Sequence, residues 1–229
     1  MQSEVSTTIE NQLGVFTLKR EKALNSLTHN MIHAIHRYAD AWSKREDINF
    51  LFFPPLQQKV YCAGGDIRWL YENGKSGNHD QQMAFFADEY RLDHAIGTYD
   101  KPVVAIVDGF LIGGGMGLLM PVQTLFGTES ATFAMPETGI GFFPDVGMSY
   151  RMSQCPGKTG LYLALTGQRI NAYEANYLGL IKGVLSDLDA INISNMAREH
   201  QGDANLNLPV RQQLTEHTVK AIHVPIAQH

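Results

Sequence analysis

A run of almost entirely β-branched residues in the middle of the chain most restricts how this sequence can fold. After Pro102, Val103 to Val107 reads Val-Val-Ala-Ile-Val, with no polar position. An unbroken apolar run of this kind is typical of a strand buried on both faces, as in a parallel sheet covered by helices. From Thr28 onward, apolar residues instead recur at three- and four-residue steps between Met31 and Trp42, which predicts one buried face of a helix. Strands that alternate with helices predict an α/β architecture.

Further elements are expected on both sides of this run. The expected strands are 14–18, 48–53, 125–128 and 132–134, and the expected helices are 158–166 and 172–178, which end at Gly167 and Gly179. A helical pattern carried by Phe86, Tyr90 and Ile96 precedes the central run, whereas the polar residues 72–80 predict a surface loop. We predict one core over residues 1–186 and a short helical C-terminal region over residues 187–229.

Composition limits the classes of function open to the chain. Its 229 residues are 44% hydrophobic, which is enough for one large core, and a net charge of −5 without a Lys/Arg block argues against a nucleic-acid partner. Cys62 and Cys155 form neither a disulfide scaffold nor a CxxC zinc motif, which favours a reducing compartment. The N-terminus lacks the pattern of a signal peptide or presequence, and the apolar stretches are too short to span a bilayer. We therefore expect a cytoplasmic protein without a membrane partner.

Two glycine-rich loops, at 63–66 and 113–115, follow strand-like segments. Glycine lets the backbone approach a ligand closely, and two converging N–H groups form an oxyanion hole that stabilises a carbonyl oxygen as it gains negative charge. The alternative is that these glycines only make tight turns and allow close helix packing. Neither loop satisfies the phosphate-binding GxxxxGK[ST] motif or the dinucleotide-binding GxGxxG motif.

Two carboxylates, Glu137 and Asp145, lie in a segment that is otherwise apolar and rich in glycine. Each follows a proline, at Pro136 and Pro144. Carboxylates are rare in such surroundings unless they are paired or functional, because desolvation raises their pKa, and such a group can act as a general acid or base near neutral pH. The alternative is that Glu137 caps one helix and Asp145 begins the next.

Several separated motifs together resemble the crotonase (enoyl-CoA hydratase/isomerase) superfamily, and within it the 3-hydroxyisobutyryl-CoA hydrolases. In chain order the motifs are the segments 60–68, 85–90, 113–117, 134–147 and 163–167. The resemblance runs from about Gly14 to Val184. It implies a stack of ββα units that forms a spiral core with CoA bound between the units. It also implies hydrolysis of a short branched 3-hydroxyacyl-CoA, a reaction of valine catabolism.

The resemblance assigns roles to individual residues. It places the oxyanion N–H groups on Gly65 and Gly114, makes Glu137 and Asp145 the catalytic carboxylates, and puts Glu89 at the acyl pocket. Substrate contacts are further implied for a set of residues around the two loops that precede residue 70: Lys22, Ala23, Leu24, Ala63, Asp66 and Ile67. No metal or redox cofactor is implied, because CoA is part of the acyl-CoA substrate. A homo-oligomer, either a trimer or a hexamer, is expected.

The position of Gly117 bears on the type of reaction. The related hydratases carry a second glutamate just after the triple glycine, and here that position is Gly117, which favours hydrolysis over water addition by two glutamates. Two other interpretations stay open: an enoyl-CoA hydratase or isomerase, and a CoA-binding protein that keeps the fold without turnover. The sequence departs from the family pattern at Met148-Ser149, where glycine is usual, and in its short C-terminal region. Longer relatives use that region to enclose the site or build the oligomer, so we expect a more open site here.

Two lesser features have ordinary explanations. His29, His33 and His36 have the spacing of one helix face and could hold a metal, but the HExxH pattern is missing, so we interpret them as a solvated face. Cys62 lies beside the first glycine loop with no histidine near it in the sequence, which favours a small buried residue over a nucleophile.

Overall fold

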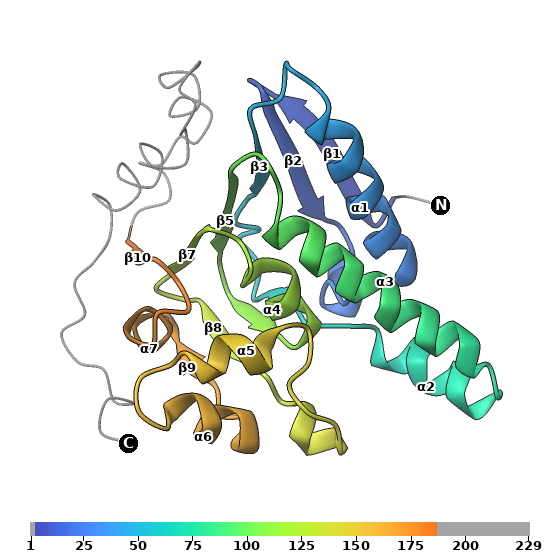
Figure 1. Ribbon diagram of the computed structural model, residues 1–229, viewed down its shortest axis with the longest axis vertical. Coiled ribbons are helices and arrows are strands. Elements are labelled where there is room, and N and C mark those ends of the chain that lie inside the picture. Colours follow the sequence, from blue (N-terminus) through green and yellow to red (C-terminus); the bar gives the residue numbers. More distant parts are fainter. Residues whose placement is uncertain (1–2, 187–229) are drawn as a thin grey trace.

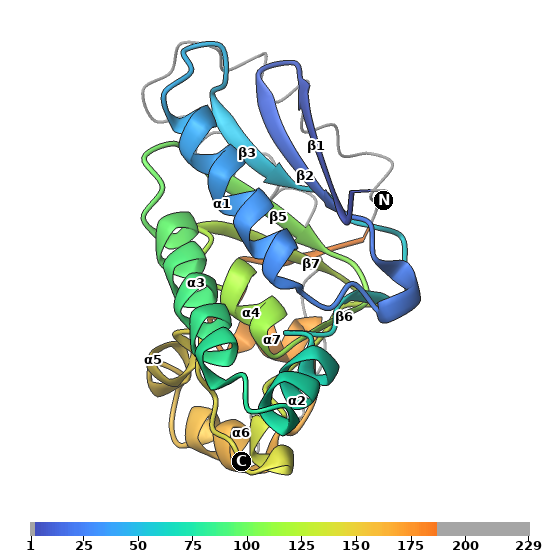
Figure 2. The ribbon, with the colours of Figure 1, turned by 90° about the vertical axis from the view of Figure 1, so that its right-hand side faces the viewer.

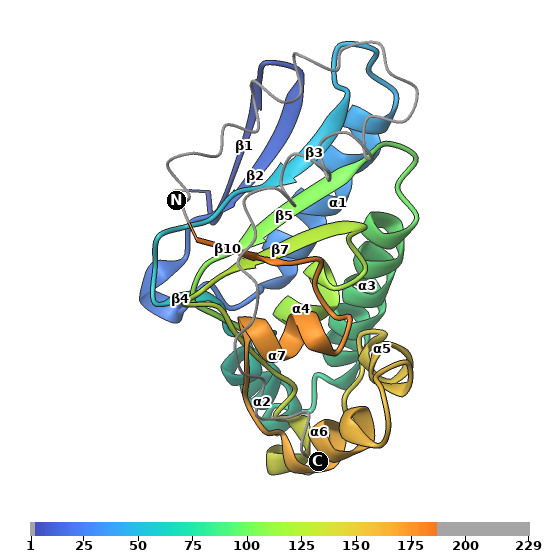
Figure 3. The ribbon, with the colours of Figure 1, turned by 90° about the vertical axis from the view of Figure 1, so that its left-hand side faces the viewer.

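Two β-sheets flanked by helices make up the structure (Figure 1). The computed structural model describes residues 3–186. The larger sheet has the strand order β1 (Val5–Glu10), β2 (Leu13–Leu18), β3 (Phe50–Phe53), β5 (Val103–Val107), β7 (Thr124–Thr128) and β10 (Val184–Leu185). The smaller sheet has the order β4 (Val60–Cys62), β6 (Phe110–Ile112), β8 (Thr132–Ala134) and β9 (Ile170–Asn171). Figure 3 shows the strands of the larger sheet in this order, with helices behind them.

From β3 to β8, successive strands along the chain belong alternately to the larger and the smaller sheet. β3, β5 and β7 enter the larger sheet, and the strand that follows each of them, β4, β6 or β8, enters the smaller one. Pairing in the larger sheet is parallel except between β1 and β2, and in the smaller sheet it is parallel except between β8 and β9. A helical segment follows each strand pair, so the chain builds a spiral of ββα units. The predicted α/β fold class with a ββα spiral core is therefore confirmed.

The helices lie between and beside the strand pairs. The α-helices are α1 (His29–Ser43), α2 (Ile67–Lys75), α3 (His79–Gly97), α4 (Gly114–Leu119), α5 (Met148–Ser153), α6 (Thr159–Thr166) and α7 (Ala172–Tyr177), and two 3₁₀ turns are η1 (Glu21–Ala23) and η2 (Glu137–Ile140). α1 and α3 pack side by side on one face of the larger sheet (Figure 2).

α1 packs against the larger sheet through its predicted apolar face. The hydroxyl of Thr28 accepts the N–H of Met31 and caps the helix. Five apolar residues on this face are buried: Met31, Ile32, Ile35, Ala39 and Trp42. The Trp42 ring lies 4.9 Å from the ring of Phe16, which in turn stacks on Phe53 at 5.2 Å. This aromatic contact ties the helix to β2 and β3, and replacing a buried aromatic residue of this kind by alanine typically costs about 3–5 kcal/mol.

The other sequence predictions have mixed outcomes. The central run forms β5, and every residue of β5 is buried, as predicted. The surface loop predicted over residues 72–80 is too long: α2 extends to Lys75 and α3 begins at His79, so only residues 76–78 form an exposed connection. The side chain of Asp66 caps α2 by accepting the N–H of Trp69, and this signal outweighs the polar composition of the last turn. The predicted helical region 187–229 lies outside the described residues. Among the helices that the structure describes, none combines the length and apolar character needed to cross a bilayer.

Candidate functional site

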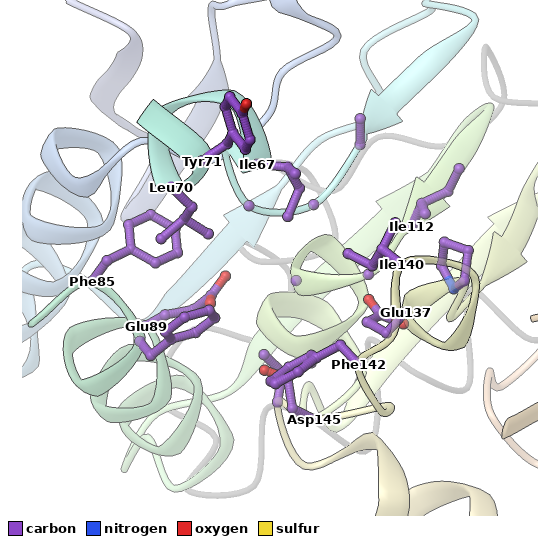
Figure 4. Close-up of a pocket in the computed structure, with 18 of the residues that line it drawn as sticks. Ile67, Leu70, Tyr71, Phe85, Glu89, Ile112, Glu137, Ile140, Phe142 and Asp145 are labelled. Carbon is purple, nitrogen blue, oxygen red and sulfur yellow. The ribbon is translucent and has the colours of Figure 1, made fainter. Parts of the chain in front are cut away.

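A cavity of about 660 Å³ opens where α3, the start of α4 and the segment after β8 meet (Figure 4). Both glycine-rich loops line it, through Gly64 and Gly65 on one side and Gly113 and Gly114 on the other. Its apolar walls come from Ile67, Leu70, Tyr71, Phe85, Phe86, Ile112, Ile140, Phe142 and Val146. Three carboxyl groups, those of Glu89, Glu137 and Asp145, also line it, and Figure 4 shows Glu89 and Glu137 entering from opposite walls. The structure therefore brings the predicted oxyanion glycines and the predicted carboxylates together.

The two predicted oxyanion amides lie close to each other. A Cβ atom built on Gly114 would be 3.2 Å from the nitrogen of Gly65. Gly114 is the first residue of α4, and the first N–H groups of a helix have no acceptor within it. Outside the regular helices and strands, no backbone hydrogen bond among residues 3–186 uses the N–H of Gly65 or of Gly114. Two residues that line the same cavity thus have backbone N–H groups for which no acceptor appears among these bonds.

The glycine positions at the floor of the cavity have no room for a side chain, because neighbouring atoms lie too close. A Cβ on Gly113, whose φ is +54°, would lie 2.7 Å from the Oε1 atom of Glu137. A Cβ on Gly114 would collide with the Oε1 atom of Glu89. Gly64, with φ of +93°, is held in the left-handed region that favours glycine, and its Cβ would be 3.2 Å from the nitrogen of Gly114. The glycines therefore do more than make turns: they let the two loops and the two glutamates share one small space.

Glu137 is the first residue of η2 and lies half-buried at the cavity wall. Its Oε2 atom has no hydrogen-bond partner among the described residues. Burial, reinforced by the negative charge of Asp145, raises the pKa of Glu137 to about 7. A carboxylate with such a pKa is suited to take and return a proton near neutral pH. Its side chain makes no helix cap, which removes the alternative structural role for this residue.

Asp145 lies between Glu137 and α5, and a tyrosine on α3 holds its carboxylate. The hydroxyl of Tyr90 donates a hydrogen bond of 2.6 Å to the Oδ2 atom of Asp145. Burial raises the pKa of Asp145, while the Tyr90 hydrogen bond opposes that rise because it stabilises the ionised form. Asp145 is thus oriented by the Tyr90 hydroxyl at the wall of the cavity.

α3 carries two more carboxyl groups one turn apart, at Glu89 and Asp93. Both side chains are buried, with 3% and 6% of their surfaces exposed. Among the described residues, Glu89 Oε1 and both oxygens of Asp93 have no hydrogen-bond partner. Burial, together with the charges of Asp145 and Glu137, raises the pKa of Glu89 to about 8, and burial raises the pKa of Asp93 well above its usual range. At neutral pH Glu89 therefore carries a proton for most of the time and acts as a neutral acid.

A second cavity, of about 600 Å³, adjoins the first at Ala63, Gly65 and Ile67, which line both. Its walls include charged and polar side chains, among them Arg20, Ser26, Asp66, Arg68 and Glu72. The Arg20 guanidinium binds Asp66 Oδ2 at 2.7 Å and the hydroxyl of Ser26 at 2.5 Å. The apolar cavity with three carboxyl groups thus continues into a polar cavity, an arrangement that fits a ligand with an apolar end and a polar end.

The predicted substrate contacts fall into three groups. Ala63 and Ile67 line both cavities, Ala23 and Asp66 line only the polar one, and Glu89 lines only the apolar one. The carboxylate of Asp66 is already used by Arg20 and by the α2 cap, so its first role is to hold the loop. Lys22 and Leu24 are exposed residues of the η1 turn and its end, and neither lines either cavity. The structure therefore does not bring these two residues into the site.

Sequence reasoning overlooked three residues of the site: Tyr90, Asp93 and Arg20. The sequence did contain one signal for Asp93, since it lies four positions after Glu89 and so shares its helix face. No local pattern indicates the Tyr90–Asp145 bond or the Arg20–Asp66 pair, because their partners are 55 and 46 residues apart in the chain.

Comparison with known proteins places these features in a family. The family model described as "Enoyl-CoA hydratase/isomerase" matches residues 13–227. Proteins named "3-hydroxyisobutyryl-CoA hydrolase, mitochondrial" are similar to the chain. The one from Danio rerio is 46% identical over 178 residues, which is 78% of this chain and 46% of that protein. The one from Homo sapiens is 42% identical over 169 residues, 73% of this chain and 43% of that protein. The chain thus spans about half the length of the curated relatives it matches.

Solved structures of the same fold are also similar. A carnitinyl-CoA dehydratase from Mycobacterium thermoresistibile has a TM-score of 0.86 and 33% identity, with 99% of this chain and 64% of that chain covered. An enoyl-CoA hydratase from Rhodobacter sphaeroides 2.4.1 has a TM-score of 0.78 and 27% identity, with 99% of this chain and 72% of that chain covered.

Proposed function

The chain belongs to the enoyl-CoA hydratase/isomerase family, and from this premise we propose that it hydrolyses the thioester of a short branched 3-hydroxyacyl-CoA to the free acid and CoA. The names of its relatives support hydrolysis, and the two joined cavities support an acyl-CoA ligand. In this proposal the acyl group occupies the cavity with the three carboxyl groups. The polar part of CoA then extends through the neighbouring cavity beside Arg20.

The oxyanion hole polarises the thioester in the first step. The carbonyl oxygen accepts hydrogen bonds from the N–H groups of Gly65 and Gly114, which are adjacent and have no competing backbone acceptor among the described residues. As a nucleophile adds to the carbonyl carbon, this oxygen gains negative charge, and both hydrogen bonds strengthen.

Glu137 supplies the nucleophilic chemistry by one of two routes. In the first, its carboxylate takes a proton from a water molecule as the water oxygen bonds to the carbonyl carbon, and the C–S bond then breaks. In the second, a Glu137 oxygen attacks the carbonyl carbon and expels the thiolate, and water cleaves the resulting anhydride. Either route consumes one water molecule and leaves the acid and CoA. A pKa of about 7 keeps enough of the group ionised at neutral pH for both routes.

Asp145 and Glu89 have supporting roles in the proposal. Asp145, held by Tyr90, orients the attacking water or returns a proton to the leaving thiolate. Glu89 is protonated at neutral pH and can donate a hydrogen bond to an oxygen of the acyl group, such as its 3-hydroxyl.

The lack of space for a side chain at Gly117 supports hydrolysis, rather than hydration, as the proposed reaction. A Cβ built at this position would collide with the side chain of Val146 and lie 2.8 Å from Asp93 Oδ2. A second glutamate therefore cannot be accommodated here without a shift of α3 or of the segment after Asp145. The enoyl-CoA hydratase interpretation is nevertheless the second candidate, because the solved structures similar to this chain include hydratases.

A thioester panel tests the proposal. The full chain is mixed with a short branched 3-hydroxyacyl-CoA, the same thioester without the hydroxyl, and the corresponding 2-enoyl-CoA. Free thiol and loss of the enoyl absorbance are followed in parallel. Thiol release that is fastest with the 3-hydroxy compound supports hydrolysis. Loss of enoyl absorbance without thiol release supports the hydratase, and binding without either reaction supports the CoA-binding interpretation. A single turnover in ¹⁸O-water then tests the second route: ¹⁸O in Glu137 shows that an anhydride formed and was cleaved at the enzyme carbonyl, whereas ¹⁸O in the acid alone is the result of direct water attack or of cleavage at the acyl carbonyl.

The proposal also includes three expectations from the sequence. We expect turnover without an added metal or redox cofactor, a homo-oligomer in solution, and a cytoplasmic location. Dialysis against a chelator before the assay tests the first, and light scattering on the full chain tests the second.

A further inference from the structure

A cluster of two histidines and one aspartate bridges α1 and α3 outside the cavities described above. The Nε2 atom of His29 lies 2.7 Å from Asp88 Oδ2, and the Nε2 atom of His33 lies 3.1 Å from the same oxygen. One ligand atom from each of the three residues lies within 4.8 Å of the other two. His29 and His33 are four residues apart, so they share a face of α1, and Figure 2 shows α3 alongside that helix.

The surroundings of Asp88 orient its carboxylate toward the histidines. Its other oxygen, Oδ1, accepts a hydrogen bond of 2.6 Å from Arg91, one turn further along α3. The His29 ring is also enclosed, since the rings of Phe85 and Trp69 lie 5.9 and 6.2 Å from it. Fixed, partly buried ligands lose little freedom when they bind an ion.

We propose that His29, His33 and Asp88 form a binding site for a divalent first-row transition metal ion, with Zn²⁺ as the reference ion, which clamps α1 to α3. Two imidazole nitrogens and one carboxylate oxygen suit Zn²⁺, Co²⁺ or Ni²⁺, whereas Mg²⁺ and Ca²⁺ prefer oxygen ligands. Ligand atoms about 2.0–2.2 Å from a tetrahedral Zn²⁺ lie roughly 3.3 Å apart. The separation of 3.1 Å between His33 and Asp88 Oδ2 therefore needs to open by about 0.2 Å, and the separation of 2.7 Å between His29 and Asp88 Oδ2 by about 0.6 Å.

The proposed metal site lies on α3 next to residues of the apolar cavity, so a bound ion would affect how this helix is held. Asp88 directly precedes Glu89, which lines the apolar cavity, and Tyr90, which holds the carboxylate of Asp145 at that cavity. A metal ion held between the helices fixes α3 at the point where it presents these two side chains. His33 is 60% exposed, so a bound ion keeps open positions on the solvent side for water. None of the three ligands lines the cavities, and the inference therefore does not depend on the proposed hydrolysis.

Calorimetry with the metal-stripped full chain tests the site. ZnCl₂ is titrated into the parent protein, MgCl₂ serves as the negative ion, and Co²⁺ gives a visible spectrum that reports its coordination geometry. The variants are His33→Ala and Asp88→Ala, and His36→Ala is the matched control, because His36 lies on α1 but outside the cluster. His33 is exposed, so its replacement leaves the fold intact, and circular dichroism verifies this for all variants.

The expected result is one Zn²⁺ per chain in the parent and in His36→Ala. We expect binding about a hundredfold weaker in His33→Ala and Asp88→Ala, since even groups outside the first coordination shell contribute about ten- to a hundredfold. Zn²⁺ should also raise the melting temperature of the parent more than that of His33→Ala. Absence of Zn²⁺ binding in the parent, or equal losses in His36→Ala and His33→Ala, would overturn the proposal.

Discussion

The polar and the apolar cavity each contain a carboxyl group near a glycine loop, and the two groups are held in opposite ways. Asp66 at the polar cavity has a partner for both oxygens: the N–H of Trp69 donates to Oδ1, and Arg20 binds Oδ2. Glu89 at the apolar cavity is more deeply buried, and its Oε1 atom has no partner among the described residues. The first carboxyl stabilises the protein as an ion, whereas the second is retained as a neutral acid.

This difference separates structural groups from groups available to a ligand. A buried polar atom without a partner typically costs about 1–3 kcal/mol, and α3 carries such atoms at both Glu89 and Asp93. Perturbed carboxyl groups gathered beside a cavity are typical of functional sites. At the polar cavity the carboxylate of Asp66 is thus satisfied within the protein, whereas the apolar cavity has a buried carboxyl oxygen that a substrate can satisfy.

The largest effect is expected from Glu137→Gln. The change keeps the size of the side chain but removes the base, so the rate of thiol release should fall about a thousandfold or more, within the range of general acid–base groups. Affinity for a CoA analogue should stay within a few-fold, because the loss falls on the reacting state. Asp66→Asn is the matched change at the polar cavity and should alter the rate constant only a few-fold. A rate for Glu137→Gln close to that of the parent would remove the base from the proposed mechanism.

The next effect concerns the floor of the apolar cavity. In Gly114→Ala the new methyl group collides with Glu89 Oε1 beside the Gly65 nitrogen, so the oxyanion position should be lost. We expect the rate to fall by about a hundredfold, the usual result of losing one oxyanion donor. Gly139→Ala is the control, since Gly139 lines the same cavity and its Cβ would meet nothing within 4 Å. Steady-state kinetics compares the two, and equal losses would show that general loosening, rather than the oxyanion hole, is responsible.

The third prediction uses stability instead of rate. The folded-state pKa of Glu89, about 8, exceeds its pKa in the unfolded chain. At pH values between these two pKa values, the folded protein therefore binds more protons than the unfolded protein. The free energy of unfolding should therefore fall as the pH rises from the ordinary carboxyl range to about 8, by up to about 1.4 kcal/mol per unit of pKa shift.

Glu89→Gln should flatten that slope and make the protein more stable than the parent above pH 8, roughly the Glu89 pKa. Asp66→Asn should instead lower the free energy of unfolding, by about 1 kcal/mol. The variant keeps a side chain that can cap α2 but loses the charge that pairs with Arg20. Urea unfolding at several pH values measures both variants. If the slope of Glu89→Gln matched that of the parent, Glu89 would not be the protonated group.

The smallest effect is expected from Tyr90→Phe. Loss of the hydrogen bond to Asp145 Oδ2 raises the pKa of Asp145, because that bond favours the ionised form. The acid limb of the pH–rate profile should move to higher pH by about one unit, which corresponds to 1.4 kcal/mol, with a few-fold loss at neutral pH. Phe86→Leu is a control that changes a neighbouring wall residue without touching Asp145. An unmoved acid limb in Tyr90→Phe would exclude Asp145 from the groups that control the rate.

How far the sequence predicts this molecule depends on the range of the interactions involved. α1 and β5 follow from local periodicity, which burial imposes directly on the residue pattern. β4 and β6 have three residues each, too few for any period to emerge, and α2 has a polar last turn that resembles a loop. In the site, proline and glycine settings indicate Glu137 and Asp145. By contrast, the unpartnered oxygens of Asp93 arise from the packing of α3 against Gly117, which no local pattern encodes.

The alternation of strands between two sheets has a consequence for biosynthesis. A nascent chain that has reached the end of α4 already contains Glu89 and both glycine loops, but neither Glu137 nor Asp145 has been translated. At that stage β5 lacks its neighbour β7 and β6 lacks its neighbour β8, so both incomplete sheets present an open parallel edge. Such edges can pair with other chains and are typical targets for chaperones during translation. The same interleaving that joins two distant halves of the chain around one cavity thus exposes the ribosome-bound intermediate to edge-to-edge aggregation.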